Sequence, residues 1–195
     1  MHGLINRAIQ RFVTDTYGEE AWQRVARAAE LGFTDFEAML IYEAVMTQRV
    51  LDAVCDDLEK PCAEVLEDLG TYLVSHPNVE ALRRLLRFGG VDFTEFLHSL
   101  NDLPDRARLA VSDLDLPELE LREHAHDRFS LTVSAPQDGF GHVMMGVLRT
   151  LADDYGALVY LEHKGGPRGR EVIDITLIEA GFAEGRHFDL AARVG

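Results

Sequence analysis

The chain has 195 residues, 47% hydrophobic and 27% charged, which is the composition of one globular unit with room for two lobes. Its 34 acidic and 19 basic side chains give a net charge of -15, which repels phosphate backbones and anionic lipid. No apolar stretch reaches the roughly 20 residues of a membrane span, and the N-terminus does not resemble a secretory signal. We therefore expect a cytoplasmic protein with no nucleic-acid partner and no membrane span.

The first half of the chain predicts helices alone. Apolar residues recur at helical spacing from residue 1 to about residue 110, with stops at Tyr17-Gly18 and at Gly89-Gly90. No stretch of this region changes to the two-residue apolar period that would indicate a strand. We expect caps or first-turn positions at Thr34 or Asp35, Thr47, Pro61, Asn78, and Asp92 or Thr94.

The second half of the chain predicts strands around one helix. After residue 115 the apolar period changes toward two, as in "RFSLTVSA", and "ELELREH", "ALVYLEH" and "EVIDITLIEA" have the same pattern. Between them, "DGFGHVMMGVLRTLADDYG" predicts a helix from Asp138 to Gly156. The predicted fold class is therefore α+β, with an N-terminal helical lobe and a C-terminal lobe whose antiparallel sheet has about four strands and an inserted helix.

Two cysteines, Cys55 and Cys62, lie within "CDDLEKPC". Pairing is possible at this spacing, but a chain without a signal peptide is expected in a reducing compartment. We therefore expect free thiols, which serve as small apolar side chains on either side of a helix break at Lys60-Pro61.

No motif of an enzyme is evident. The glycines of "GFGHVMMG" do not fit a dinucleotide fingerprint, and no H-E-x-x-H, G-x-S-x-G or Ser-His-acid constellation occurs. In "REHAHDR", His124 and His126 share one face of a strand, but their place between two strands favours a solvated hairpin turn over a metal site. We expect no catalytic residue, and a helical lobe beside a sheet lobe suits the enclosure of a ligand between them.

Three segments in order carry a resemblance to a known family. "MHGLINRAIQRFVTDTYGEEAW", "LRRLLRFGGVDFTEFLHSLNDL" and "GFGHVMMGVLRTLADDYG" resemble the opening, the proximal-helix region and a later helix of the heme nitric oxide/oxygen-binding (H-NOX) family. This family includes the sensor domain of soluble guanylate cyclases and bacterial stand-alone sensors. The resemblance covers essentially the whole chain and implies a single domain, with a distal helical lobe over residues 1–75 and a proximal lobe with the sheet over residues 76–195.

The resemblance also implies where heme would be held, and the residues there differ from the family pattern. The family's ligand histidine aligns with Pro104, which has no lone pair to offer iron. The Tyr-x-Ser-x-Arg triplet that holds the propionates aligns with Val133, Ala135 and Gln137, and an amide cannot supply the charge of a guanidinium. Pro117 aligns with a proline that the family keeps against the heme.

Heme is thus the family cofactor, and our leading expectation is that this chain binds none. His98, six residues before Pro104, is the fallback iron ligand, although about 1.7 helical turns separate their directions. His142, beside Val143, is a second alternative of the same standing. Candidates for the wall of an apolar cavity between the lobes are Ile5, Ile9, Val74, Leu100, Leu103, Pro104, Pro117, Val133, Ala135, Gln137 and Val143.

Three functions remain open from the sequence. The leading one is an H-NOX-fold sensor or adaptor that has lost heme, binds an apolar, lipid-like small molecule or has an empty, repacked core, and signals in trans, since 195 residues leave no room for an output domain. By resemblance, its partner is a histidine kinase or a cyclic-dinucleotide enzyme. The second is a heme-based nitric oxide sensor with noncanonical axial ligation. The third is a protein-interaction module without a ligand.

Overall fold

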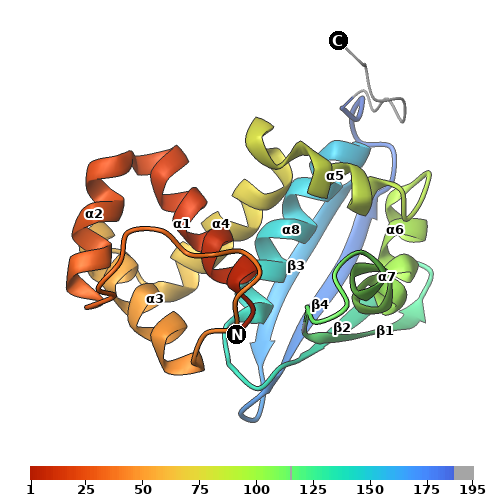
Figure 1. Ribbon diagram of the computed structural model, residues 1–195. Helices are drawn as coiled ribbons and strands as arrows, with labels where there is room; N and C mark the ends of the chain where they lie inside the picture. The colour runs from red at the N-terminus through yellow and green to blue at the C-terminus, as the bar shows by residue number, and fades with distance from the viewer. Residues whose placement is uncertain (115, 187–195) are drawn as a thin grey trace.

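The computed structural model describes residues 1–114 and 116–186. The helices of residues 1–75 form one lobe, and the sheet with the later helices forms the other; α4 (Cys62–Ser75) and α8 (Phe140–Tyr155) pack together where the lobes meet (Figure 1). The N-terminal lobe contains α1 (Gly3–Tyr17), α2 (Glu19–Ala28), α3 (Ala44–Leu58) and α4 (Cys62–Ser75). The remaining elements are η1 (Pro77–Val79), α5 (Glu80–Arg87), α6 (Phe93–Ser99), η2 (Leu100–Asp102), α7 (Leu103–Ala110), β1 (Glu118–Ala125), β2 (Arg128–Ser134), α8 (Phe140–Tyr155), β3 (Leu158–Gly165) and β4 (Arg170–Glu179).

The sheet has the antiparallel order β1-β2-β4-β3, which confirms the predicted α+β class. Its register places Leu121, Leu131, Ile173 and His163 opposite one another in one row across the four strands. Because side chains alternate between the faces of a strand, one face of the sheet is apolar. This face packs against α6, η2 and α8 in a single core.

The proximal helix is broken where Pro104 enters it. The sequence predicted a helix that begins at Asp92 or Thr94, but α6 ends at Ser99, one 3-10 turn follows, and α7 begins at Leu103. Pro104 lies in the first turn of α7, where its missing N–H would have no helical partner in any case. Of the two predicted caps, Asp92 is the correct one, since its side chain accepts a hydrogen bond from Glu95 N (2.8 Å).

The predicted short helix after Thr34 or Asp35 is wrong. Asp35 does not cap a helix and instead accepts a hydrogen bond from the Gln10 side chain (2.8 Å), while Gln10 Oε1 accepts one from Phe36 N (3.0 Å). Trp22 Nε1 donates to the carbonyl of Thr34. Contacts with α1 and α2 therefore hold this segment in an irregular path, because tertiary contacts outweigh a local capping preference.

Three further predicted helix starts are shifted. Thr47 lies inside α3, which begins at Ala44. The His76 side chain, not Asn78, caps the turn before α5 and accepts a hydrogen bond from Asn78 N (3.3 Å). Gly139 precedes α8 with φ of 106°, and the Asp138 carboxylate accepts a bond from Gly169 N instead of capping the helix.

The expectation of free thiols is wrong, because Cys55 and Cys62 form a disulfide. Glu59 takes the left-handed conformation just after α3, and Pro61 then precedes α4. This tight reversal brings the two cysteine Cα atoms to 5.3 Å, which is within the usual range for a bridge.

None of the helices over the described residues has both the length and the apolar character needed to cross a membrane.

Candidate functional site: an apolar cavity between the lobes

A cavity of about 390 Å³ lies between the two lobes. Its size falls within the range of about 300–1,000 Å³ that is typical of small-molecule sites. The N-terminal lobe contributes side chains from α1, α3 and α4, and the C-terminal lobe contributes α5, α7, α8 and the segment that leads into β1. A ligand bound in this cavity therefore contacts both lobes.

The structure brings most of the predicted wall residues together at this cavity. Those that line it are Ile5, Ile9, Leu103, Pro104, Pro117, Gln137 and Val143.

Four of the predicted wall residues lie elsewhere. Val74, Leu100 and Val133 are almost fully buried in the core between the sheet and its helices. Ala135 follows β2, where its N–H donates to the carbonyl of Gly169 (3.0 Å). None of these four side chains lines the cavity.

Several leucines that the sequence interpretation missed form much of the wall. On α4 the lining side chains are Leu66, Leu69 and Leu73, so the cavity-facing stripe passes one residue before Val74. Their spacing of three and four residues places them on one helix face, and this spacing was a readable signal in the sequence. Further lining leucines are Leu4, Leu51, Leu82, Leu85, Leu86, Leu114, Leu116 and Leu119.

The few polar side chains of the wall are mostly engaged with other parts of the protein. Thr47 Oγ1 donates to Asn6 Oδ1 (2.7 Å), and Gln137 Nε2 donates to the carbonyl of Ala44 at the start of α3 (3.3 Å). Asp138 accepts a bond from Gly169 N, as described above. Gln48, which also lines the cavity, donates from Nε2 to Asp52 Oδ1 (2.9 Å). The other lining side chains are apolar, so the cavity favours apolar groups.

The lining residues do not fit a heme held in the family manner. Among the described residues that line the cavity, none is a histidine, cysteine, lysine or arginine, and the soft donor atoms are the thioether sulfurs of Met1 and Met144. Pro104 and Gln137, which the resemblance aligns with the ligand and propionate positions, cannot replace an imidazole or a guanidinium. The described lining thus offers no cationic side chain to pair with propionates, and the Met1 ammonium donates to the carbonyl of Tyr42 (2.7 Å).

The fallback ligand His98 is outside the cavity. Its imidazole is half exposed, and Nε2 lies 3.2 Å from Glu123 Oε2 on the neighbouring strand β1. His124 lies near the end of β1, where its Nε2 is 2.7 Å from Ser130 Oγ, and His126 lies in the turn between β1 and β2. Both side chains are exposed, and the solvated hairpin turn that the sequence indicated contains His126 but not His124.

Comparisons with known proteins point to one family. The model of the family described as Haem-NO-binding matches residues 2–163. Among solved structures, the chain is similar to an H-NOX protein from S. oneidensis in the Fe(II)NO ligation state, with 17% identity, a TM-score of 0.76 and coverage of 91% of this chain and 99% of that one. It is also similar to an unliganded Fe(II) H-NOX protein from K. algicida, with 16% identity, a TM-score of 0.74 and coverage of 92% and 97%.

Two curated relatives are much longer than this chain. "Soluble guanylate cyclase gcy-31" of Caenorhabditis elegans is 22% identical over 154 residues, which are 79% of this chain and 22% of the relative. "Soluble guanylate cyclase 89Db" of Drosophila melanogaster is 18% identical over 158 residues, 81% of this chain and 24% of the relative. The chain therefore spans about a quarter of the length of these relatives.

Proposed function

This chain belongs to the Haem-NO-binding family, and we propose that it is a sensor domain whose cavity binds an uncharged, apolar small molecule in place of heme. The observation that carries the proposal is that Pro104 and Gln137, at the family's iron-ligand and propionate positions, both line this cavity. The space for a ligand is thus present, while the groups that would hold a metalloporphyrin have been replaced. The domain itself senses and performs no catalysis.

The wall selects against charged ligands. Of its described side chains only Asp138 is acidic, and none is a lysine or arginine that could pair with a carboxylate. Burying an unpaired charge costs several kcal/mol or more, whereas each buried CH₂ group of a ligand contributes about 0.8 kcal/mol. An aliphatic chain with a neutral head fits this balance better than a fatty acid.

Ligand binding can be transmitted because both lobes form the wall. Ile5 and Ile9 of α1 face the cavity from one side, and Leu103 and Pro104 of α7 face it from the other. A ligand that fits one arrangement of the lobes better than another shifts the population toward that arrangement. The cavity is therefore placed where its occupancy can change the relative position of the lobes.

The output goes to a signalling enzyme in trans, in our proposal a histidine kinase or a cyclic-dinucleotide enzyme in the cytoplasm. Two relatives named as soluble guanylate cyclases match this chain over about a quarter of their length, which supports a sensing role beside a separate catalytic unit.

Binding of a fluorescent apolar probe tests the ligand proposal. The purified chain is titrated with N-phenyl-1-naphthylamine, and the probe is displaced with decanol or with decanoate. We expect saturable binding that decanol reverses at least tenfold more effectively than decanoate. In Ala8→Phe the added ring fills the cavity, and we expect binding to fall at least tenfold. Ala81→Phe, at an exposed site of α5, is the matched control and should bind as the wild type does.

The other two functions give different results in the same preparation. A stoichiometric Soret band after heme is supplied, shifted by nitric oxide, would show a heme sensor with unusual ligation. Absence of both the Soret band and probe binding, together with no thermal stabilisation by decanol, would show a protein-interaction module. Equal binding in Ala8→Phe and the wild type would show that the probe occupies some other surface.

A further inference from the structure

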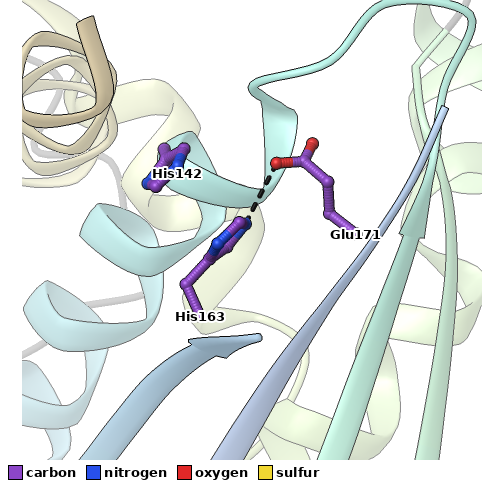
Figure 2. A group of neighbouring side chains, drawn as sticks. All are labelled: His142, His163 and Glu171. Atoms are coloured by element: carbon purple, nitrogen blue, oxygen red, sulfur yellow. Dashed lines mark hydrogen bonds and ion pairs between the residues drawn. The ribbon is translucent and has the colours of Figure 1, made fainter. Parts of the chain in front are cut away.

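Two histidines and a glutamate from three elements meet outside the cavity. His142 lies in the first turn of α8, His163 near the end of β3 and Glu171 near the start of β4 (Figure 2). One donor atom from each residue lies within 4.8 Å of the other two. The alternation of the strands explains the meeting, because Glu171 is on the same face of β4 as Ile173 and His163 is on the same face of β3 as Leu161.

The three side chains are shielded and closely placed. The imidazoles of His142 and His163 are stacked, with centroids 4.1 Å apart, and His163 Nε2 lies 3.0 Å from Glu171 Oε1. The side chains of His163 and Glu171 are 17% and 11% exposed, so the group is partly shielded while water can still reach it. A carboxylate carried on the otherwise apolar face of a sheet is costly unless it is well paired.

A second layer of contacts orients these groups from behind. Glu171 Oε2 accepts hydrogen bonds from the backbone N–H groups of Gly139 (2.9 Å) and Gly141 (3.0 Å), which leaves Oε1 directed at His163. His142 Nδ1 lies 3.5 Å from Glu67 Oε1, and Arg149 in turn holds Glu67 (2.9 Å). A carboxylate behind one imidazole nitrogen fixes the tautomer and leaves the other nitrogen free to bind a metal.

The space between the donors depends on Gly141. A Cβ atom at this position would lie 2.7 Å from both His163 Nε2 and Glu171 Oε1. Any side chain here would therefore push into the gap between the two donors. Glycine keeps this gap open and allows the start of α8 to approach the strands.

We propose that His142, His163 and Glu171 bind a divalent transition metal of the Zn²⁺ class. Two imidazoles and one carboxylate form a ligand set that suits zinc, cobalt and related ions, with a fourth position for water. In a tetrahedral site with bonds of about 2.0–2.1 Å the donors are roughly 3.4 Å apart, so binding brings the donors closer together and rotates the stacked imidazoles until a nitrogen of each points at the ion. The metal takes the place of the direct contact between His163 Nε2 and Glu171 Oε1.

The metal would connect the first turn of α8 to the β3–β4 hairpin. Glu171 already holds this turn through Gly139 N and Gly141 N, and a metal adds a bond through His142. Because the net charge is -15, the protein also attracts cations in general. The test must therefore separate a specific site from unspecific attraction.

Metal titration of the purified chain, without a histidine tag and stripped with a chelator, is the direct test. We expect one equivalent of Zn²⁺ by calorimetry, and visible absorption typical of tetrahedral coordination when Co²⁺ is used. His163→Gln and Glu171→Gln should each weaken binding at least tenfold. Glu67→Gln, which alters only the group behind His142, should weaken it by a smaller factor with the stoichiometry unchanged.

The matched control is His98→Gln. His98 and Glu123 form a second histidine–glutamate pair at 3.2 Å, and among the residues that the structure describes no third donor completes it. This variant should bind Zn²⁺ as the wild type does. Circular dichroism and the Tm of each metal-free variant show whether it folds, and if His163→Gln is unfolded, the half-buried His142→Gln serves in its place.

Three outcomes would overturn the proposal. The first is a wild-type chain that binds neither Zn²⁺ nor Co²⁺. The second is binding that persists unchanged when His142, His163 or Glu171 is replaced. The third is binding that disappears in a His124→Gln/His126→Gln variant, which would place the ion at the exposed hairpin instead.

Discussion

Gly70 of α4 lies directly against Gly146 of α8. A Cβ atom added to Gly70 would be 3.1 Å from Gly146 Cα and 2.0 Å from the carbonyl oxygen of Val143. In the same way, a Cβ atom on Gly146 would be 2.0 Å from the carbonyl oxygen of Glu67. The two helices that join the lobes therefore touch through their backbones, at a distance that only glycine permits.

Gly70→Ala should separate these helices and destabilise the protein. We expect the free energy of unfolding to fall by about 1–3 kcal/mol, as for other overpacked interiors. For a chain of this length that corresponds to a Tm lower by roughly 2–4 °C per kcal/mol, measured by thermal denaturation. Gly181→Ala is the control, since a Cβ there meets nothing within 4 Å. Equal Tm values for the two variants would contradict the close contact.

Tyr72→Phe should reduce stability in a manner that depends on pH. Burial alone raises the pKa of Asp15, but hydrogen bonds from Tyr72 Oη (2.6 Å) and Asn78 Nδ2 (3.0 Å) outweigh it and hold that pKa below its ordinary value. A depressed carboxyl pKa stabilises the folded state above the unfolded-state pKa of about 3.9, and this stabilisation is lost as the pH falls through the folded-state value. Removing the phenol hydroxyl moves the pKa of Asp15 back upward.

The expected loss for Tyr72→Phe is about 1.5 kcal/mol at pH 7, the size of a hydrogen bond to a charged group. The difference from the wild type should shrink below about pH 4, because Asp15 is then protonated in the unfolded chain and increasingly in the folded one. Urea denaturation at pH 7 and at pH 3 measures both values. Tyr160→Phe, whose side chain is exposed, should show no such difference at either pH.

A double variant, Pro104→His with Gln137→Arg, tests the interpretation of the cavity as a vacated heme site. The first change supplies an imidazole nitrogen for iron, and the second supplies a guanidinium for a propionate. With heme supplied, we expect a Soret band in the double variant and none in the wild type. Leu109→His, on the exposed side of α7, is the control and should behave as the wild type does. A stoichiometric band in the wild type would contradict the interpretation.

Reduction of the disulfide should weaken the N-terminal lobe. The bridge between Cys55 and Cys62 closes a short loop, which in the chain-entropy model contributes about 2 kcal/mol. We expect a reductant to lower the Tm of the wild type by roughly 4–8 °C. Cys62→Ser, which lacks the bridge, should have a Tm below that of the disulfide-bonded wild type both with and without reductant. A reductant effect of equal size in Cys62→Ser would mean that the bridge is not its cause.

The strands of the sheet were predictable because the alternation of apolar and polar residues that marks a strand is visible within a short stretch of sequence. Along β1, Leu119 and Leu121 are buried between exposed charged residues, and a period of two appears wherever one face of a strand meets a core. Helix starts were less predictable. Asp35 is a residue type that often caps a helix, but its carboxylate instead accepts a hydrogen bond from the side chain of Gln10, which lies in α1, far away in the sequence.

The family pattern predicted the candidate site only in part, since Val133 and Ala135, aligned with the same propionate triplet as Gln137, do not line the cavity. Pro104 and Gln137 were placed in the cavity wall by alignment with heme-binding positions, and both line it. Val74 was predicted to line the cavity, but the residue before it does so instead. The orientation of a helix about its axis is set by contacts on all its sides, which the sequence pattern does not give. The meeting of His142, His163 and Glu171 could not be predicted, because it depends on how the first turn of α8 packs over two strands.

Gly139 belongs to two places at once: its N–H donates to Glu171, and the residue also lines the cavity. If a metal ion bound at Glu171 restricts Gly139 and a ligand in the cavity contacts it, thermodynamic linkage requires that each changes the binding affinity of the other by the same factor. Such a domain would respond to a metal ion and an apolar molecule together, and the backbone N–H of Gly139 would connect the two binding sites.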